Sequence, residues 1–114
     1  MTTIYVAIAV FGMAALFGMY LLSLILRNKT TPKGVTLIHG AMAAIALVLL
    51  IIYALGNSPG PWSSIIIFII AALGGFVLNY RDITGKTIPK WLGVVHGLAA
   101  VTGFILLLLF AFQK

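Results

Sequence analysis

The fold is decided by a short stretch of sequence that occurs twice. Residues 29–40 read KTTPKGVTLIHG, and residues 86–97 read KTIPKWLGVVHG. At the same offset of 57 positions, residues 13–54 align with residues 70–111, and 15 of these 42 positions are identical. The matches include Lys-Thr, Pro-Lys and His-Gly pairs, which an apolar composition alone explains poorly. We therefore infer that a helix hairpin was duplicated in tandem, with repeat 1 at about 4–55 and repeat 2 at about 62–112.

Four apolar runs make up most of the sequence, and two of them overlap with the two copies. Hydrophobic residues make up 63% of the chain and charged residues only 7%, whereas charged residues are roughly a quarter of a soluble domain. The runs cover 4–26, 35–55, 62–80 and 91–112, each near the ~20 residues that span a bilayer as a helix. We expect an all-α integral membrane four-helix bundle that forms a single domain over residues 1–114, because the linkers are too short to fold separately. The first run is expected to be a retained helix, since it has no basic region before it and is too long for a signal peptide.

The basic residues predict the orientation in the membrane. The net charge is +6, but the charges lie in loops 27–34 and 81–90 rather than on a folded face, which argues against a nucleic-acid partner. The positive-inside rule places both loops in the cytoplasm and both termini on the non-cytoplasmic side. We expect the bilayer to be a bacterial inner (plasma) membrane. Lys33 and Lys90 are expected to reach the headgroups of its cytoplasmic leaflet.

Two histidines lie at one depth in the predicted bundle. His39 and His96 follow the matched prolines by seven residues, which places both ~10 Å inside the cytoplasmic end. A polar side chain at such a depth points to function by default. The helical neighbours of both histidines are small, which predicts a shallow groove: Thr36, Ala43, Ala46, Gly93, Ala100 and Gly103. Gly18 and Gly75 occupy matching positions on the odd helices in the same layer.

This pattern resembles the four-helix haem bundle of membrane b-type cytochromes. The resemblance implies one b-type haem, with His39 and His96 as axial ligands of the iron and an electron-transfer role. It also implies that Gly18 and Gly75 leave room for the porphyrin. Further contacts implied with the haem are close approach at Gly40 and Gly97, and propionate binding by Arg27, Lys33, Arg81 and Lys90. Dihaem relatives have four such histidines and this chain has two, so we expect a quinone or another redox partner, in a homodimer or a larger membrane complex.

Two other functions are compatible with the same residues. The histidines can bond between helices in an accessory subunit that binds no cofactor. By size and helix count the chain also resembles small multidrug-resistance transporters, although the first run lacks the glutamate on which these rely.

Catalysis by protein side chains is not favoured, because no catalytic set is present, and the absence of cysteine excludes covalent c-type haem and disulfides. Asp82, the single acidic residue, is expected to form a solvated loop ion pair with Arg81, and Thr31 to cap the second helix.

Overall fold

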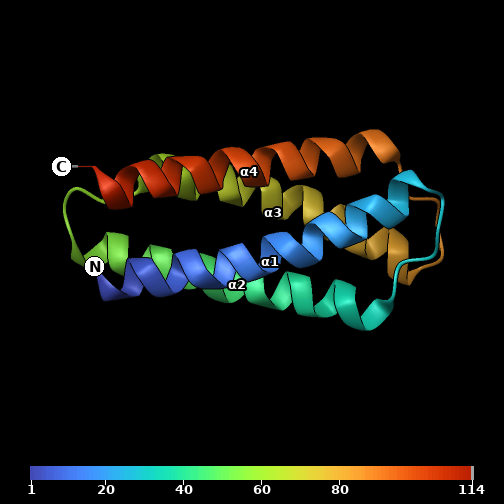
Figure 1. The fold of residues 1–114 in the computed structure, drawn as a ribbon, viewed down its shortest axis with the longest axis horizontal. Coiled ribbons are helices and arrows are strands. Elements are labelled where there is room, and N and C mark those ends of the chain that lie inside the picture. Colours follow the sequence, from blue (N-terminus) through green and yellow to red (C-terminus); the bar gives the residue numbers. More distant parts are fainter. Residues whose placement is uncertain (114) are drawn as a thin grey trace.

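The chain folds into four long antiparallel helices (Figure 1). The structure is a computed structural model that describes residues 1–113. The helices are α1 (Thr2–Leu26), α2 (Lys33–Gly56), α3 (Trp62–Ile83) and α4 (Lys90–Phe112). These bounds match the four apolar runs to within three residues at each end. The all-helical prediction is therefore confirmed for the described residues.

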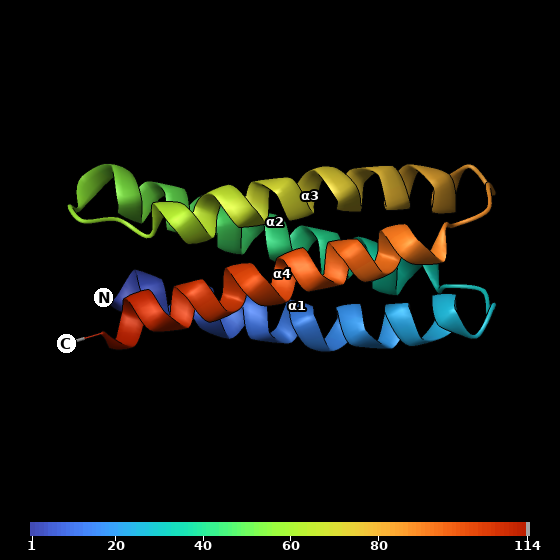
Figure 2. The same ribbon diagram turned by 90° about the horizontal axis from the view of Figure 1, so that it is seen from above.

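The helices form a square arrangement with two closely paired hairpins. α1 packs mainly on α2, and α3 mainly on α4, while α1 also contacts α4 and α2 contacts α3. The remaining pairs, α1 with α3 and α2 with α4, lie diagonally across the bundle (Figures 1 and 2). Loops 27–32 and 84–89 lie together at what we call the loop end. The chain termini and linker 57–61 lie at the opposite, terminal end of a bundle 44 Å long.

The two loops at the loop end leave their helices through the same turn. After α1, Asn28 takes a left-handed conformation with φ of 56°, and the Lys29 amide donates to the Leu24 carbonyl at 2.8 Å. After α3, Gly85 has φ of 72°, and the Lys86 amide donates to the Arg81 carbonyl at 2.8 Å. This is the Schellman ending, in which a left-handed residue satisfies the last free carbonyls of a helix. Asn28 and Gly85 are 57 positions apart, so the two loops begin alike.

The starts of α2 and α4 correct one expectation. Pro32 and Pro89 precede the helices, both with φ of −65° and ψ of 125°, and the first helical residues are Lys33 and Lys90. Neither start has a side-chain cap. The expected capping by Thr31 is therefore wrong, because its hydroxyl donates to the carboxylate of Asp82 at 2.6 Å instead.

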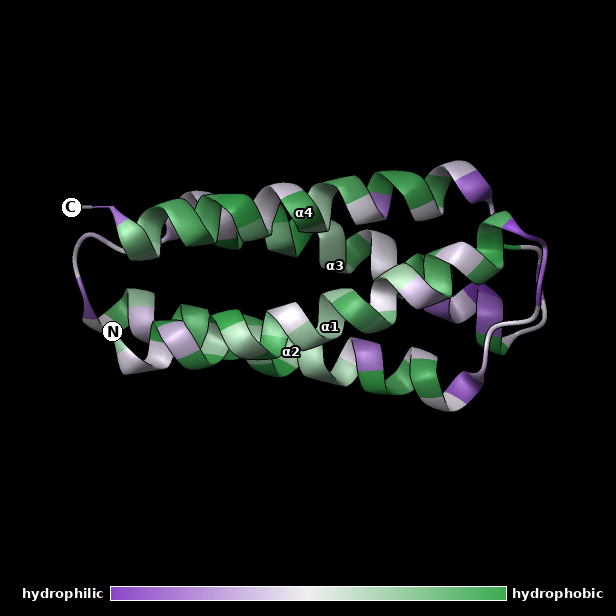
Figure 3. Ribbon diagram, in the orientation of Figure 1, coloured by the Kyte–Doolittle hydropathy of each residue, from purple (hydrophilic) through white to green (hydrophobic). Residues whose placement is uncertain are grey.

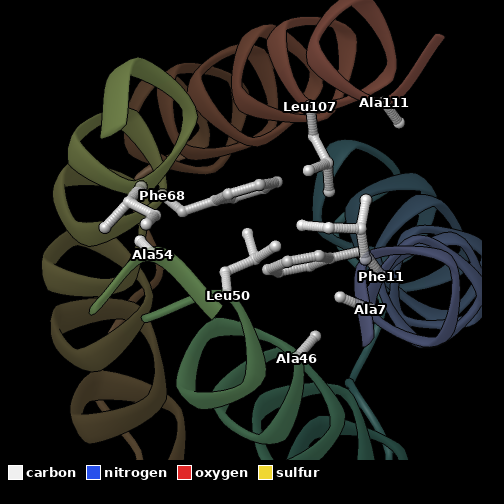
Figure 4. Packing of buried hydrophobic residues seen from close by; sticks show 10 residues of the cluster. Ala7, Phe11, Ala46, Leu50, Ala54, Phe68, Leu107 and Ala111 are labelled. Carbon is white, nitrogen blue, oxygen red and sulfur yellow. The ribbon is translucent and has the colours of Figure 1, made fainter. Parts of the chain in front are cut away.

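The buried core lies in the half of the bundle near the terminal end (Figure 4). Phe11 of α1 and Phe68 of α3 stack across it, with ring centroids 4.0 Å apart and an interplanar angle of 6°. Around this pair lie small and branched residues from all four helices: Ile4, Ala7, Ala46, Leu50, Ala54, Ile65, Leu107 and Ala111. Small residues let helix backbones approach closely, which is how apolar helices pack when water supplies no driving force.

The outer surface is strongly apolar. Leu55, Phe76 and Trp91 are 75%, 71% and 67% exposed. Figure 3 shows that hydrophilic residues gather at the loop end, while the helices are mostly hydrophobic along their length. All four helices are long and apolar enough to cross a membrane. A contiguous apolar surface of this extent is typical of a protein that contacts lipid.

Candidate functional site

The two histidine rings lie close together in the loop-end half of the bundle. His39 comes from α2 and His96 from α4, which lie diagonally across the bundle. Their ring centroids are 6.2 Å apart, and the ring planes are nearly perpendicular, at 85°. Both side chains are half-buried. The duplicated His-Gly pairs therefore place two imidazoles next to each other.

Each imidazole is held by a backbone carbonyl of its own hairpin. Nδ1 of His39 lies 2.8 Å from the Ala14 carbonyl oxygen of α1, and Nδ1 of His96 lies 2.7 Å from the Ala71 carbonyl oxygen of α3. A carbonyl oxygen only accepts hydrogen bonds, so the proton of each neutral ring must be on Nδ1. The other ring nitrogen, Nε2, then carries a free lone pair that can bind a metal.

Gly18 and Gly75 make this arrangement sterically feasible. A Cβ atom at Gly18 would lie 2.9 Å from Cε1 of His39, and one at Gly75 would lie 3.1 Å from Cε1 of His96. Both distances are shorter than normal carbon contacts, so any side chain would push the ring away. Glycine is needed at these positions because the imidazole of the same hairpin occupies the space that a side chain would fill.

The other predicted close approaches differ between the two repeats. Gly40 is exposed, and a Cβ there would meet no described atom within 4 Å. Within the described residues, Gly40 therefore makes no close contact with another helix. At Gly97 a Cβ would lie 3.7 Å from Leu22, which is an ordinary contact.

The small residues near the histidines lie against neighbouring helices. Ala46 is fully buried in the core, and Ala43 packs against the core. A Cβ at Gly103 would lie 3.1 Å from Phe68, and one at Gly93 would lie 3.3 Å from Leu22. Neighbouring helices therefore occupy these positions, so these small residues serve helix packing.

The four basic residues assigned to propionates have different surroundings. Arg27 donates to the Ser23 carbonyl at 3.1 Å, and Arg81 donates to the Thr87 carbonyl at 2.6 Å. Lys33 bonds to Asp82, while Lys90 is exposed at the first turn of α4. Three of the four side chains therefore already have partners within the chain.

Asp82, at the loop end, has surroundings that differ from those expected from the sequence. It lies in the last turn of α3 and is only 8% exposed, so it is neither in a loop nor freely solvated. Its carboxylate accepts hydrogen bonds from Lys33 at 2.7 Å, Thr31 at 2.6 Å and Thr36 at 3.3 Å, all from the chain around the start of α2. The expected ion pair with Arg81 is wrong. The sequence did hold one signal, because Asp82 breaks the repeat at the position of the apolar Ile25.

The ligand set available to a metal is small. Among residues 1–113, no three His, Cys, Asp or Glu side chains gather in a way that would hold a metal ion. Metal binding by the described residues would therefore rely on the two imidazoles and on ligands from a cofactor. Comparison with known protein families, with characterised proteins and with solved structures finds no match. Arguments about function rest on the residues of this chain.

Proposed function

We propose that this chain is a small membrane electron-transfer protein that binds one b-type haem between His39 and His96. The observation that carries the proposal is the separation of the two rings, 6.2 Å between centroids. A metal midway between them would lie about 3 Å from each centroid. An Nε2 atom that points to such a metal would lie about 2 Å from it, which is the usual length of a bond between an imidazole and a metal.

The hydrogen bonds of the rings support the same assignment. Histidines that bind metals almost always donate their second ring N–H to a carbonyl or carboxylate, which fixes the ring and increases its basicity. The carbonyls of Ala14 and Ala71 serve this role for His39 and His96. Iron bound by two imidazoles and a porphyrin exchanges single electrons and has no open position for oxygen.

The arrangement of the helices also supports a flat cofactor. The histidines come from one diagonal of the bundle, α2 and α4, and Gly18 and Gly75 come from the other, α1 and α3. The imidazole of the same hairpin fills the space at each glycine, so the glycines support the proposal by letting both rings lie between the helices. The main apolar core lies in the opposite half of the bundle.

The basic residues at the loop end are relevant to binding of the haem propionates and to the orientation of the protein in the membrane. Of the four basic residues assigned to the propionates, Arg27, Arg81 and Lys33 have partners within the chain, which leaves Lys90 as the candidate among these four. By the positive-inside rule, the basic loops favour a cytoplasmic position for the loop end, which leaves the termini on the non-cytoplasmic side. The proposed membrane is the inner membrane of a bacterium. A single haem cannot pass electrons across the bilayer alone, so a quinone or a redox protein is needed as partner, with the chain acting as a homodimer or within a larger complex.

The proposal is tested by purifying the protein in detergent after expression with ample haem. We expect about one haem per chain, with a sharp α-band after reduction by dithionite. His39→Ala and His96→Ala should each abolish this low-spin spectrum, whereas Leu37→Ala, a change on the exposed side of α2, should leave it intact. Full retention of the spectrum in the double His variant would overturn the proposal.

A second function is favoured by one specific observation. Each imidazole already has a carbonyl partner and a glycine surface within its own hairpin, which suits an interhelical contact in a cofactor-free accessory subunit. In that case the purified protein is colourless with ample haem present, and His39→Ala lowers its stability without changing any spectrum. Co-purification with a larger membrane complex would support this role.

A further inference from the structure

The two copies of the Lys-Thr pair meet at one cavity. The cavity lies between the loops at the loop end and has a volume of about 350 Å³. Lys29 and Thr30 line it from the first loop, and Lys86 and Thr87 line it from the second. The pairs are 57 positions apart in the sequence, and each follows the same Schellman ending. Duplication of one loop has therefore placed two equal sets of cationic and hydroxyl groups around a single space.

The charge of the cavity is positive. Lys33 and Asp82 also line it, but they pair with each other at 2.7 Å. Lys86 lies over the ring of Tyr80, with its ammonium 5.0 Å from the ring centroid, which holds it without neutralising it. Because Asp82 is the only acidic side chain in the sequence, no other carboxylate side chain competes for Lys29 and Lys86. Two ammonium groups are therefore available to an anion.

The chemistry and size of the cavity define the ligand. Lysine ammonium groups and threonine hydroxyls are common donors to phosphate oxygens. Cavities that hold small ligands have volumes of about 300–1,000 Å³, so this one exceeds the needs of bare phosphate and suits a phosphate with an attached group. Ile25 and Ile88 add apolar surface to the lining. The cavity also lies at the same end as the exposed Trp91, a residue type that prefers the membrane interface.

We propose that this cavity is a binding site for the phosphate of an anionic lipid headgroup, such as that of phosphatidylglycerol. The site is independent of the haem and concerns a different part of the bundle. Lys29 and Lys86 bind the phosphate from opposite sides, and Thr30 and Thr87 donate to its oxygens. The bound lipid then ties the two hairpins together at the end opposite the main apolar core.

The test measures lipid binding to the full-length protein in detergent by native mass spectrometry. Phosphatidylglycerol is titrated against phosphatidylcholine and against soluble sn-glycerol 3-phosphate. We expect one phosphatidylglycerol per chain to bind preferentially. Lys29→Gln with Lys86→Gln should weaken its binding about 30-fold, from roughly a factor of five for each lysine, while Lys29→Arg with Lys86→Arg should retain it.

The matched control is Arg27→Gln, which removes one charge at the same end from a residue that does not line the cavity, and it is compared with Lys29→Gln. Arg27→Gln should leave phosphatidylglycerol binding within about twofold of the unmodified protein. Equal weakening by Arg27→Gln and Lys29→Gln would overturn the proposal, because binding would then follow total charge. Equally tight binding of sn-glycerol 3-phosphate would overturn the assignment to a lipid. Circular dichroism of each variant shows whether the helices are retained.

Discussion

Nζ of Lys33 lies 2.7 Å from Oδ1 of Asp82, and this ion pair joins the first turn of α2 to the last turn of α3. The equivalent junction between α1 and α4 is apolar, because Ile25 takes the place of Asp82 and lies 3.9 Å from where a Cβ of Gly93 would be. The two hairpins therefore meet through a polar contact on one side and an apolar contact on the other. The polar contact forms at only one of the two junctions between the repeats, because only repeat 2 has an acidic residue at this position.

Asp82→Ala is expected to destabilise the bundle. The change removes hydrogen bonds from Lys33, Thr31 and Thr36. We expect the free energy of unfolding to fall by about 1–2 kcal/mol. This is at the lower part of the range for hydrogen bonds to charged groups, because Lys33 is half exposed and can return to solvent. SDS-induced unfolding in mixed micelles, followed by circular dichroism, measures the loss. Ile83→Ala, at the exposed neighbouring position, is the control, and equal stability of Asp82→Ala and the unmodified protein would show that the contact contributes nothing.

Two glycine substitutions are expected to have opposite effects. Gly18→Ala places a methyl group 2.9 Å from His39, so the ring must shift, at a cost of about 1–3 kcal/mol as for other overpacked sites. Gly40→Ala meets no described atom within 4 Å and should stabilise α2 by roughly 0.5–1 kcal/mol, because glycine loses more chain entropy in a helix. The same unfolding assay compares the two. A stabilising Gly18→Ala would mean that His39 does not lie against α1.

Adjacent serines in α3 offer a test of the contact between α3 and α4. The hydroxyl of Ser64 is buried and donates to the Gly103 carbonyl at 2.8 Å, whereas Ser63 is exposed. We expect Ser64→Ala to cost about 0.5–1.5 kcal/mol and Ser63→Ala to be neutral within the error of the unfolding measurement. Equal effects of the two changes would contradict the packing of α4 on this face of α3.

The apolar runs were sufficient to predict the four helices, because length and hydropathy are properties of each segment alone. The helix ends were less certain. α3 continues through Arg81 and Asp82 to Ile83, since the ion pair with Lys33 satisfies the acid inside the last turn. That partnership depends on which helices are neighbours in space, and the sequence pattern does not contain this information.

The candidate site was predictable in the same partial way. The repeat identified His39 and His96 and placed them at one depth, and it paired Gly18 with Gly75. It did not predict that each ring bonds to a carbonyl of its own hairpin, because backbone carbonyls leave no trace in the residue pattern. Nor did it decide between a helix and a cofactor as the neighbour of the small residues, because small residues serve helix packing and cofactor binding equally well, as Ala46 and Gly103 show.

The most direct test of the central claim is electron paramagnetic resonance of the oxidised protein, purified after expression with ample haem. The rings of His39 and His96 are perpendicular within 5°, at 85°. Axial imidazoles in perpendicular planes give ferric haem a strongly anisotropic low-spin signal. We predict that signal at about one spin per chain, with its loss in His39→Ala and in His96→Ala. A high-spin haem signal, or protein without haem despite ample supply, would contradict ligation by this pair.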